Sequence, residues 1–409
     1  MKCRHCEAEI TLAVVDLGSA PPSNAYLTAE TLHAPEKWYP LRVLVCERCW
    51  LAQTEDFSQA HELFSDDYAY FSSVSASWLA HAERYVATAA ERFKLGPQSL
   101  VVEIAANDGY LLQYVKARGI PCLGVEPTAS TAAAAREKGI AIVPDFFGVA
   151  LATTLRDDGR SADLTAANNV LAHVPDINDF VAGFAILLKP NGVSTFEFPH
   201  LLRLVAENQF DTIYHEHYSY LSLSSVDRIF AANGLTVFDV EEISTHGGSL
   251  RVYAQRTDTG QHARCVAVAQ LLAREKASGV LTANYYAGFQ AATDAVKNDF
   301  LSFLLDAKRE GKAVAGYGAA AKGNTLMNYA GVRPDLISFV VDRSASKQGK
   351  FMPGSRIPIV DEAYLKAAKP DYIVILPWNL KAELSSQLDY ARAWGAKLVT
   401  AVPSMWISP

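Results

Sequence analysis

The sequence predicts an α/β protein built in three parts, and three observations carry this prediction. Two Cys-x-x-Cys pairs stand near the N-terminus. A strand, a small-residue turn and a helix follow at 101–115, and a second such segment lies at 311–329. Around both, short apolar runs alternate with stretches of helical periodicity, as in a parallel sheet covered by helices. We therefore expect a small zinc module over 1–65, a doubly wound domain over 66–255, and a helical connector with a Rossmann-like domain over 256–409.

Composition limits the classes of protein and partner. The chain has 409 residues, 50% hydrophobic and 20% charged, which is enough for two or three globular domains, each with its own core. Its net charge of -7 and the lack of a basic run argue against nucleic acid as a partner. No apolar run approaches about 18 residues and no apolar leader begins the chain, so we expect no membrane partner and a cytoplasmic location. The sequence does not fix the oligomeric state, and we expect a monomer.

The cysteines indicate a metal site. Four of the six form two pairs, Cys3 with Cys6 and Cys46 with Cys49. In a reducing compartment two such pairs present four thiolates, the ligand set of a tetrahedral structural zinc ion. Four free thiols or a redox centre are the alternatives, and neither explains the duplication. Because four protein ligands close the coordination sphere, we expect Zn²⁺ to stabilise the module rather than to take part in chemistry.

The segment VVEIAANDGYLLQYV at 101–115 predicts the ligand of the central domain. A turn at the carboxyl end of a core strand exposes backbone N–H groups where open α/β sheets bind ligands. Only Gly109 stands in this turn, whereas a dinucleotide pyrophosphate needs three glycines. Glu103 in the strand and Glu126 at the end of the next suit a cationic amino acid end and a ribose, which S-adenosylmethionine (SAM) combines. The alternative, a turn without a ligand, leaves Glu103 as an unpaired acid in a buried strand.

Polar residues at the same edge of the sheet extend this predicted cofactor site. Asn168 and Asn169 follow the apolar run of a later strand, so we expect them to face the ligand crevice. A helix is predicted at 77–93, and a helix, a turn at 190–192 and another strand follow the crevice residues. The residues that we expect to bind SAM are Glu103, Ala105, Asn107, Asp108, Gly109, Glu126, Pro127, Asn168 and Asn169.

The densest group of titratable side chains stands at 210–222, FDTIYHEHYSYLS. It places Tyr214, His215, Glu216 and His217 in a row. Such a set is costly to bury unless it is used or fully paired, so we interpret it as catalytic. Residues two positions apart share a face only where the chain is extended. Metal ligation by the two histidines lacks an HExxH helix or a third ligand, and a plain surface loop does not need three tyrosines.

Further candidate residues lie at the pocket edge. His173 stands at the carboxyl edge of the central sheet. The aromatic and hydroxyl-rich stretch 64–78 is typical of a loop over a pocket, in which Tyr68 and Tyr70 supply hydroxyl groups to a substrate or simply pack.

Two glycine-containing stretches suggest substrate contacts. In STHGGSLR, two glycines allow close backbone approach beside side chains that suit an anionic or hydroxylated substrate, although a mere β-turn is the alternative. In GYGAAAKGNTL, phosphate could rest on the helix N-terminus beside Lys322, and the Gly316/Gly318 spacing equally fits NAD. The residues that we expect to bind substrate are His246, Gly247, Arg251, Lys322 and Asn324.

Taken in order, the motifs resemble the sugar C-methyltransferases that act on nucleotide-linked 4-keto-deoxysugars. The resemblance covers nearly the whole chain and rests on the paired cysteines and on EIAANDGYLL, NNVLAHVPD, FDTIYHEH, THGGSLR, GYGAAAKGNTL and DRSASKQGKFMPG. It implies an N-terminal zinc module, a central SAM domain and a C-terminal Rossmann-like domain, with the sugar nucleotide between the last two.

The resemblance also implies a mechanism. A 4-keto group acidifies the hydrogen on C3, a base removes it, and the enolate attacks the methyl group of SAM. By similarity His217 is the base, with Glu216 orienting it and Tyr214 beside the keto oxygen, while His173, Tyr68 and Tyr70 are further pocket groups. A histidine has the near-neutral pKa that such a base needs. The alternatives are an O-methyltransferase, an NAD-dependent oxidoreductase using the second glycine turn, and a zinc-stabilised binding protein without catalysis.

Overall fold

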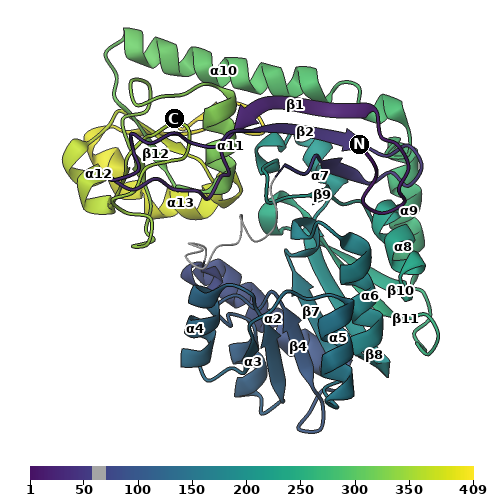
Figure 1. Ribbon diagram of the computed structural model, residues 1–409. Coiled ribbons are helices and arrows are strands. Elements are labelled where there is room, and N and C mark those ends of the chain that lie inside the picture. The colour runs from purple at the N-terminus through teal and green to yellow at the C-terminus, as the bar shows by residue number, and fades with distance from the viewer. Residues whose placement is uncertain (58–70) are drawn as a thin grey trace.

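The computed structural model describes residues 1–57 and 71–409 and shows a chain folded around three sheets (Figure 1). The central sheet has the strand order β10-β11-β8-β7-β4-β5-β6. Its strands are β4 (Val101–Ile104), β5 (Cys122–Val125), β6 (Ile142–Val143), β7 (Ala162–Asn168), β8 (Leu188–Pro199), β10 (Leu235–Ile243) and β11 (Ser249–Arg256). All pairs are parallel except those of β11, which is antiparallel to both neighbours. The chain order reverses between β4 and β7, and an open α/β sheet binds its ligand at such a point.

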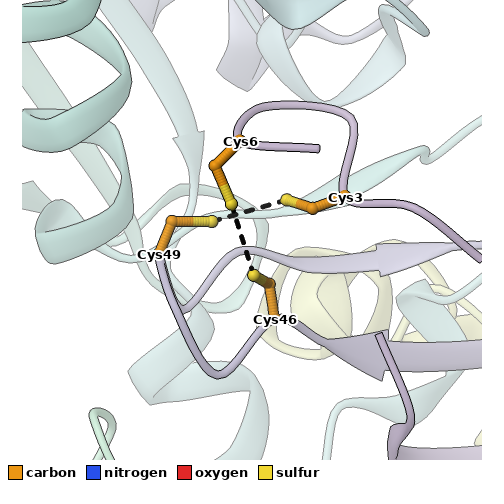
Figure 2. A group of neighbouring side chains, drawn as sticks. All are labelled: Cys3, Cys6, Cys46 and Cys49. Carbon is orange, nitrogen blue, oxygen red and sulfur yellow. Dashed lines mark hydrogen bonds between the residues drawn. The ribbon is translucent and has the colours of Figure 1, made fainter. Parts of the chain in front are cut away.

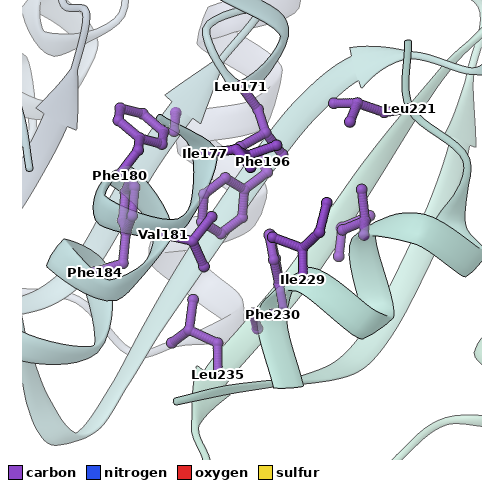
Figure 3. Packing of buried hydrophobic residues seen from close by; sticks show 14 of the residues in the cluster. Leu171, Ile177, Phe180, Val181, Phe184, Phe196, Leu221, Ile229, Phe230 and Leu235 are labelled. Atoms are coloured by element: carbon purple, nitrogen blue, oxygen red, sulfur yellow. The ribbon is translucent and has the colours of Figure 1, made fainter. Parts of the chain in front are cut away.

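Helices cover both faces of the central sheet because its core strands are apolar on both. Val101 shares a buried cluster with α2 and α3, whereas its neighbour Val102 shares another with α5, α6 and α8. Figure 3 shows the second cluster, in which Phe196 of β8 lies between Phe184 and Phe230, with ring centroids 4.7 and 4.6 Å away. The helices are α2 (Ala76–Arg92), α3 (Leu112–Ala117), α4 (Ala129–Glu137), α5 (Val149–Asp157), α6 (Ile177–Leu187), α7 (Leu201–Ala206) and α8 (Leu223–Ala232). The predicted doubly wound fold is confirmed.

Local predictions agree with the elements except at one turn. The helix expected at 77–93 is α2, and the hydroxyl oxygen of Ser75 accepts the Trp78 N–H at its start. The turn expected at 190–192 is instead part of β8. There the register passes from Ala162–Leu188 to Leu164–Val193, so the extra residues form a bulge.

The N-terminal module is a four-stranded antiparallel sheet that borrows a strand. Its order is β1-β2-β3-β9. The strands are β1 (Leu12–Ala20), β2 (Tyr39–Val45), β3 (Ala52–Thr54) and β9 (Ser219–Tyr220). Because β9 lies within the predicted catalytic segment 210–222, that segment is attached to the N-terminal module.

The C-terminal sheet has the order β14-β13-β12-β15-β16-β17 and is parallel except for β17. Its chain order also reverses, between β12 and β15, which supports the predicted Rossmann-like arrangement. The strands are β12 (Val314–Tyr317), β13 (Val340–Val341), β14 (Ile359–Val360), β15 (Tyr372–Ile375), β16 (Lys397–Thr400) and β17 (Trp406–Ile407). The helices of this half are α9 (Val266–Ser278), α10 (Phe289–Arg309), α11 (Ala321–Tyr329), α12 (Glu362–Ala368) and α13 (Lys381–Gln387).

The N-terminal and C-terminal sheets share one core. Val15 of β1, Phe300 of α10 and Val340 of β13 belong to a single buried cluster, and α10 runs along β1 in Figure 1. The expectation that each part has its own core is therefore wrong for these two, since so small a sheet buries its apolar face only against a neighbour. Within the described ranges, none of the helices has the length and apolarity needed to cross a bilayer.

Candidate active site

A cavity of about 1160 Å³ lies where the three parts meet. Its wall includes Asn24 from the N-terminal module, Glu126 and His217 from the central part, and Lys322 at the start of α11. Pockets for one ligand measure about 300–1,000 Å³. The cavity therefore has room for two ligands, one at the carboxyl edge of each parallel sheet.

The four paired cysteines converge on one point, as Figure 2 shows. Their sulfur atoms all lie within 4.8 Å of one another, and those of Cys3 and Cys49, and of Cys6 and Cys46, are 3.5 Å apart. Thiolates bound tetrahedrally to zinc at about 2.3 Å stand about 3.8 Å apart, whereas a disulfide bond measures about 2.05 Å. The spacing fits zinc and excludes a disulfide.

The turn after β4 has the backbone geometry of a ligand-binding loop. Ala105, Asn107 and Gly109 have φ angles of +57°, +47° and +74°, a left-handed conformation that is strained for alanine. A Cβ atom on Gly109 would stand 2.4 Å from Ile140, so this position requires glycine. One carboxylate oxygen of Glu126 accepts the Asn107 N–H at 2.8 Å. The turn and the acid after β5 are thereby held together at the cavity wall.

The predicted cofactor residues divide between the wall and the layer behind it. Glu103, Asp108 and Gly109 are buried behind the wall, and burial raises the pKa of Glu103 well above its usual range. Both amide atoms of the buried Asn168 lack a hydrogen-bond partner in the described part of the chain, as expected of a group that meets a ligand. The predicted cofactor residues on the wall are Ala105, Asn107, Glu126, Pro127, Asn168 and Asn169.

Tyr214 and His217 form a pair with a defined proton arrangement. Nδ1 of His217 lies 2.8 Å from the Thr212 carbonyl oxygen, and its Nε2 lies 2.7 Å from the Tyr214 hydroxyl. A carbonyl oxygen only accepts, so Nδ1 carries the proton and Nε2 accepts from the phenol. The segment is a turn, since the His217 N–H donates to the Tyr214 carbonyl at 2.9 Å. Residues three apart therefore meet here, and the extended form that would pair residues two apart is absent from this segment.

The environment of His217 is dry and positive. Burial lowers its pKa well below the ordinary value, and His173, Lys322 and His246 lower it further. The His173 ring lies 4.6 Å from the His217 ring, and burial lowers the pKa of His173 to about 4. Both imidazoles are thus neutral at pH 7, and His217 can accept a proton. The expectation that this pKa needs little tuning is wrong, because burial and the nearby Lys322 cation lower it.

The other members of the segment have separate contacts. Oε1 of Glu216 accepts a hydrogen bond from the Asn24 side chain at 2.6 Å. Because Thr212 and Tyr214 occupy both ring nitrogens of His217, the orientation expected from Glu216 comes from Thr212 instead. His215 faces away, with Nε2 3.3 Å from two carbonyl oxygens at the start of β2.

On the C-terminal side, Lys322 and His246 reach the cavity. Nζ of Lys322 lies 3.1 Å from Asn379 Oδ1 and 4.8 Å from the ring centre of Trp378. Burial lowers the pKa of Lys322, and the nearby Asp211 opposes this change. Lys322, which is half-buried, thus brings a positive charge close to His217 and His246.

The remaining predicted substrate residues are less available. Arg251 lines the cavity, but its guanidinium pairs with Glu197 at 2.7 Å and with Glu241 at 3.2 Å. The Gly247 carbonyl accepts from Gln209 at 2.7 Å, and the buried Asn324 side chain donates to the Ser23 carbonyl at 2.7 Å. Neither Gly247 nor Asn324 belongs to this cavity's wall. The residue types in the sequence do not show that these side chains and carbonyl groups already have hydrogen-bond or ion-pair partners within the protein.

The wall also includes residues that were not predicted from the sequence. Tyr68 and Tyr70 lie outside the described residues. Asn24, Trp78 and His81 line the cavity although the sequence analysis did not select them. Trp78 and His81 stack with ring centroids 4.9 Å apart on α2, and only their placement on the helix face toward the cavity distinguishes them.

Comparison with known proteins defines the class. Three family models match in order: a zinc binding domain over 3–64, a methyltransferase domain over 78–240, and a C-methyltransferase C-terminal domain over 244–403. The protein is a SAM-dependent C-methyltransferase with a four-cysteine structural zinc site. This sets aside the O-methyltransferase, oxidoreductase and non-catalytic alternatives.

A curated relative defines the family. The chain is 34% identical over 402 residues to the C-methyltransferase NovU of Streptomyces niveus, covering 98% of this chain and 95% of that protein. The chain belongs to the C-methyltransferase family that includes NovU.

Solved structures match the chain more distantly. Magnesium protoporphyrin IX methyltransferase (ChlM) from Synechocystis PCC 6803 with bound SAM is 16% identical, with a TM-score of 0.34 over 44% of this chain and 79% of that chain. A SAM-dependent methyltransferase from Clostridium acetobutylicum ATCC 824 is 10% identical, with a TM-score of 0.36 over 44% of this chain and 92% of that chain.

Proposed function

We propose that the protein methylates C3 of a nucleotide-linked 4-keto-deoxysugar through an enolate, with His217 as the general base. The observation that carries this proposal is the Thr212–His217–Tyr214 chain of hydrogen bonds on the wall of a cavity shared by both parallel sheets. A keto group acidifies the adjacent C–H bond, and a neutral imidazole in reach can remove its proton.

The side chains divide the work of this step. Nε2 of His217 accepts the C3 proton, while the Thr212 carbonyl steadies the resulting imidazolium through Nδ1–H. For this transfer the Tyr214 hydroxyl first turns from Nε2 to the keto oxygen, which frees the Nε2 lone pair and stabilises the negative charge that develops on that oxygen. The Lys322 cation and the His173 ring face the same region and favour the anion. When bound, SAM supplies the electrophilic methyl group that C3 takes up.

The two ligands occupy the two sheet edges in this proposal. Glu126, Asn107 and Asn168 would hold SAM at the β4 turn, with Glu126 as the acceptor for its ribose hydroxyls. The sugar nucleotide lies along the C-terminal sheet, with the sugar between His217 and Lys322. This division follows from the two points at which chain order reverses, one in each sheet.

Mass spectrometry tests both acceptor and route. The enzyme is incubated with SAM and a panel of nucleotide-linked 4-keto-6-deoxysugars, in light and in heavy water. We expect one added methyl group on carbon, and solvent deuterium at C3 when SAM is omitted. A methyl group on C3 without such exchange would contradict the separate enolate, and turnover only with acceptors that lack a keto group would refute the substrate class.

A further inference from the structure

One arginine of the zinc site is enclosed by the protein. Arg4 stands between the zinc ligands Cys3 and Cys6, and its side chain is only 5% exposed. The Arg4 backbone N–H donates to Gln53 Oε1 at 3.0 Å, and Nε2 of the same glutamine donates to Cys3 Sγ at 3.3 Å. Because zinc ligands stand on both sides of Arg4, metal binding fixes the position of the Arg4 backbone.

The Arg4 guanidinium connects three segments of the chain. It donates to the carbonyl oxygens of Thr54 at 2.9 Å and Pro175 at 3.0 Å, and it binds both carboxylate oxygens of Asp56 at 2.7 and 3.1 Å. Its central carbon lies 5.2 Å from the ring centre of the buried Tyr218. A planar group with several fixed donors holds its partners in a defined geometry, which a flexible lysine does not.

These contacts fall directly beside the two histidines of the active site. Pro175 follows His173 by two residues, and Tyr218 is the next residue after His217. The Tyr218 N–H donates to the Ala172 carbonyl at 2.8 Å, which joins the two histidine segments. The Thr54 hydroxyl donates to the His217 carbonyl at 3.0 Å. Arg4 therefore lies behind the two histidines whose rings meet edge to face in the cavity.

We propose that Arg4 is a positioning residue, through which the zinc site sets the spacing of His173 and His217 for proton abstraction. The inference rests on the proposed function for what the two histidines do, but their placement by Arg4 is a separate structural claim. In this proposal the metal takes no part in the chemistry but still affects the reaction rate. It fixes the backbone of Arg4, and the Arg4 side chain supports the segments that carry His173 and His217.

The chain supplies a matched control. Arg48 also stands between two zinc ligands, Cys46 and Cys49, one place further along its pair than Arg4, and it is exposed. The test compares Arg4→Met with Arg48→Met for zinc content, SAM affinity by calorimetry, kcat, KM and deuterium exchange at C3. We expect Arg4→Met to keep one zinc ion per chain and normal SAM affinity, while kcat and C3 exchange fall about 100-fold, the effect of a displacement of about 1 Å. Arg4→Lys should recover part of the loss, and Arg48→Met should equal the parent protein.

A second pair of measurements keeps the inference open to refutation if Arg4→Met folds poorly or the acceptor differs. Thr54→Val removes only the hydroxyl that supports the His217 carbonyl, and we expect kcat to fall about tenfold. In NMR of ¹⁵N-histidine-labelled protein without substrate, the ring signals of His173 and His217 should move in Arg4→Met and stay in Arg48→Met. Unchanged ring signals, or equal kcat in the two methionine variants, would overturn the role of Arg4. Failure of the parent enzyme to exchange C3 would overturn the proposed function alone.

Discussion

Replacement of His217 by asparagine removes the proposed base and little else. The asparagine amide can still donate to the Thr212 carbonyl, as Nδ1–H does at 2.8 Å. Nothing replaces Nε2, the acceptor of the Tyr214 hydroxyl. General-base catalysis contributes about 10²–10⁴-fold, or roughly 3–5 kcal/mol of transition-state stabilisation. Because His217 is only 9% exposed, bulk water is poorly placed to act instead. We therefore expect kcat to fall about 10³-fold.

The assay measures kcat at saturating SAM together with SAM affinity, which should not change. His215→Asn is the control on the same turn, because that side chain faces the carbonyl oxygens at the start of β2. The pKa of His217 is lowered chiefly by burial, so the free enzyme should keep its base neutral below about pH 6.5, the ordinary histidine value. The acidic limb of kcat/KM should lie below that pH. A His217→Asn enzyme that retains more than a tenth of the parent kcat refutes the reasoning.

Three further changes test the cofactor site, a buried hydrogen-bonded carboxylate and the zinc site. Glu126→Gln should raise the Kd of SAM about 30-fold in calorimetry, since charged hydrogen bonds contribute about 1.5–3 kcal/mol. An unchanged Kd would show that the ribose does not bind to Glu126. Glu275 lies 2.7 Å from His200 Nε2, and although burial tends to raise its pKa, the bond to His200 helps to lower it. Glu275→Gln should cost roughly 3 kcal/mol of unfolding free energy at pH 7. The difference in unfolding free energy between the parent protein and this variant should narrow as pH falls below about 4.3, because the pKa of Glu275 is lower in the folded than in the unfolded protein. A difference that does not change with pH in urea titrations contradicts this. Cys49→Ser should lose zinc by elemental analysis and lower Tm by roughly 5–10 °C, whereas Cys265→Ser, at an exposed thiol, should do neither.

The local elements could be predicted because their causes are local. Apolar strand residues followed by a polar turn with one glycine led directly to β4 and its loop, and the cysteine pairs led to the four-sulfur cluster. The turn at 190–192 was misplaced because a proline and a glycine also fit a bulge, and only pairing with β7 decides between them. The shared core of β1, α10 and β13 was missed because it joins residues hundreds of positions apart.

The sequence predicted which residues belong to the candidate site better than it predicted the contacts between them. His217, Tyr214 and Glu126 do line one cavity. The bond between Asn24 and Glu216, 192 positions apart, leaves no trace in either local pattern. Arg251 looked free to bind an anion, whereas β8 and β10 supply the carboxylates that already hold it.

The sequence by itself determined which chemical groups the protein has and the order in which its elements form, because periodicity, turn residues and cysteine spacing act over a few residues. Tertiary structure alone decided what those groups can do. It turned the segment after Thr212 so that residues three apart meet, buried His217 so that its pKa falls, and set Arg4 of the zinc site behind both histidines. These outcomes depend on burial and on contacts between distant segments, which arise only when the three sheets pack together.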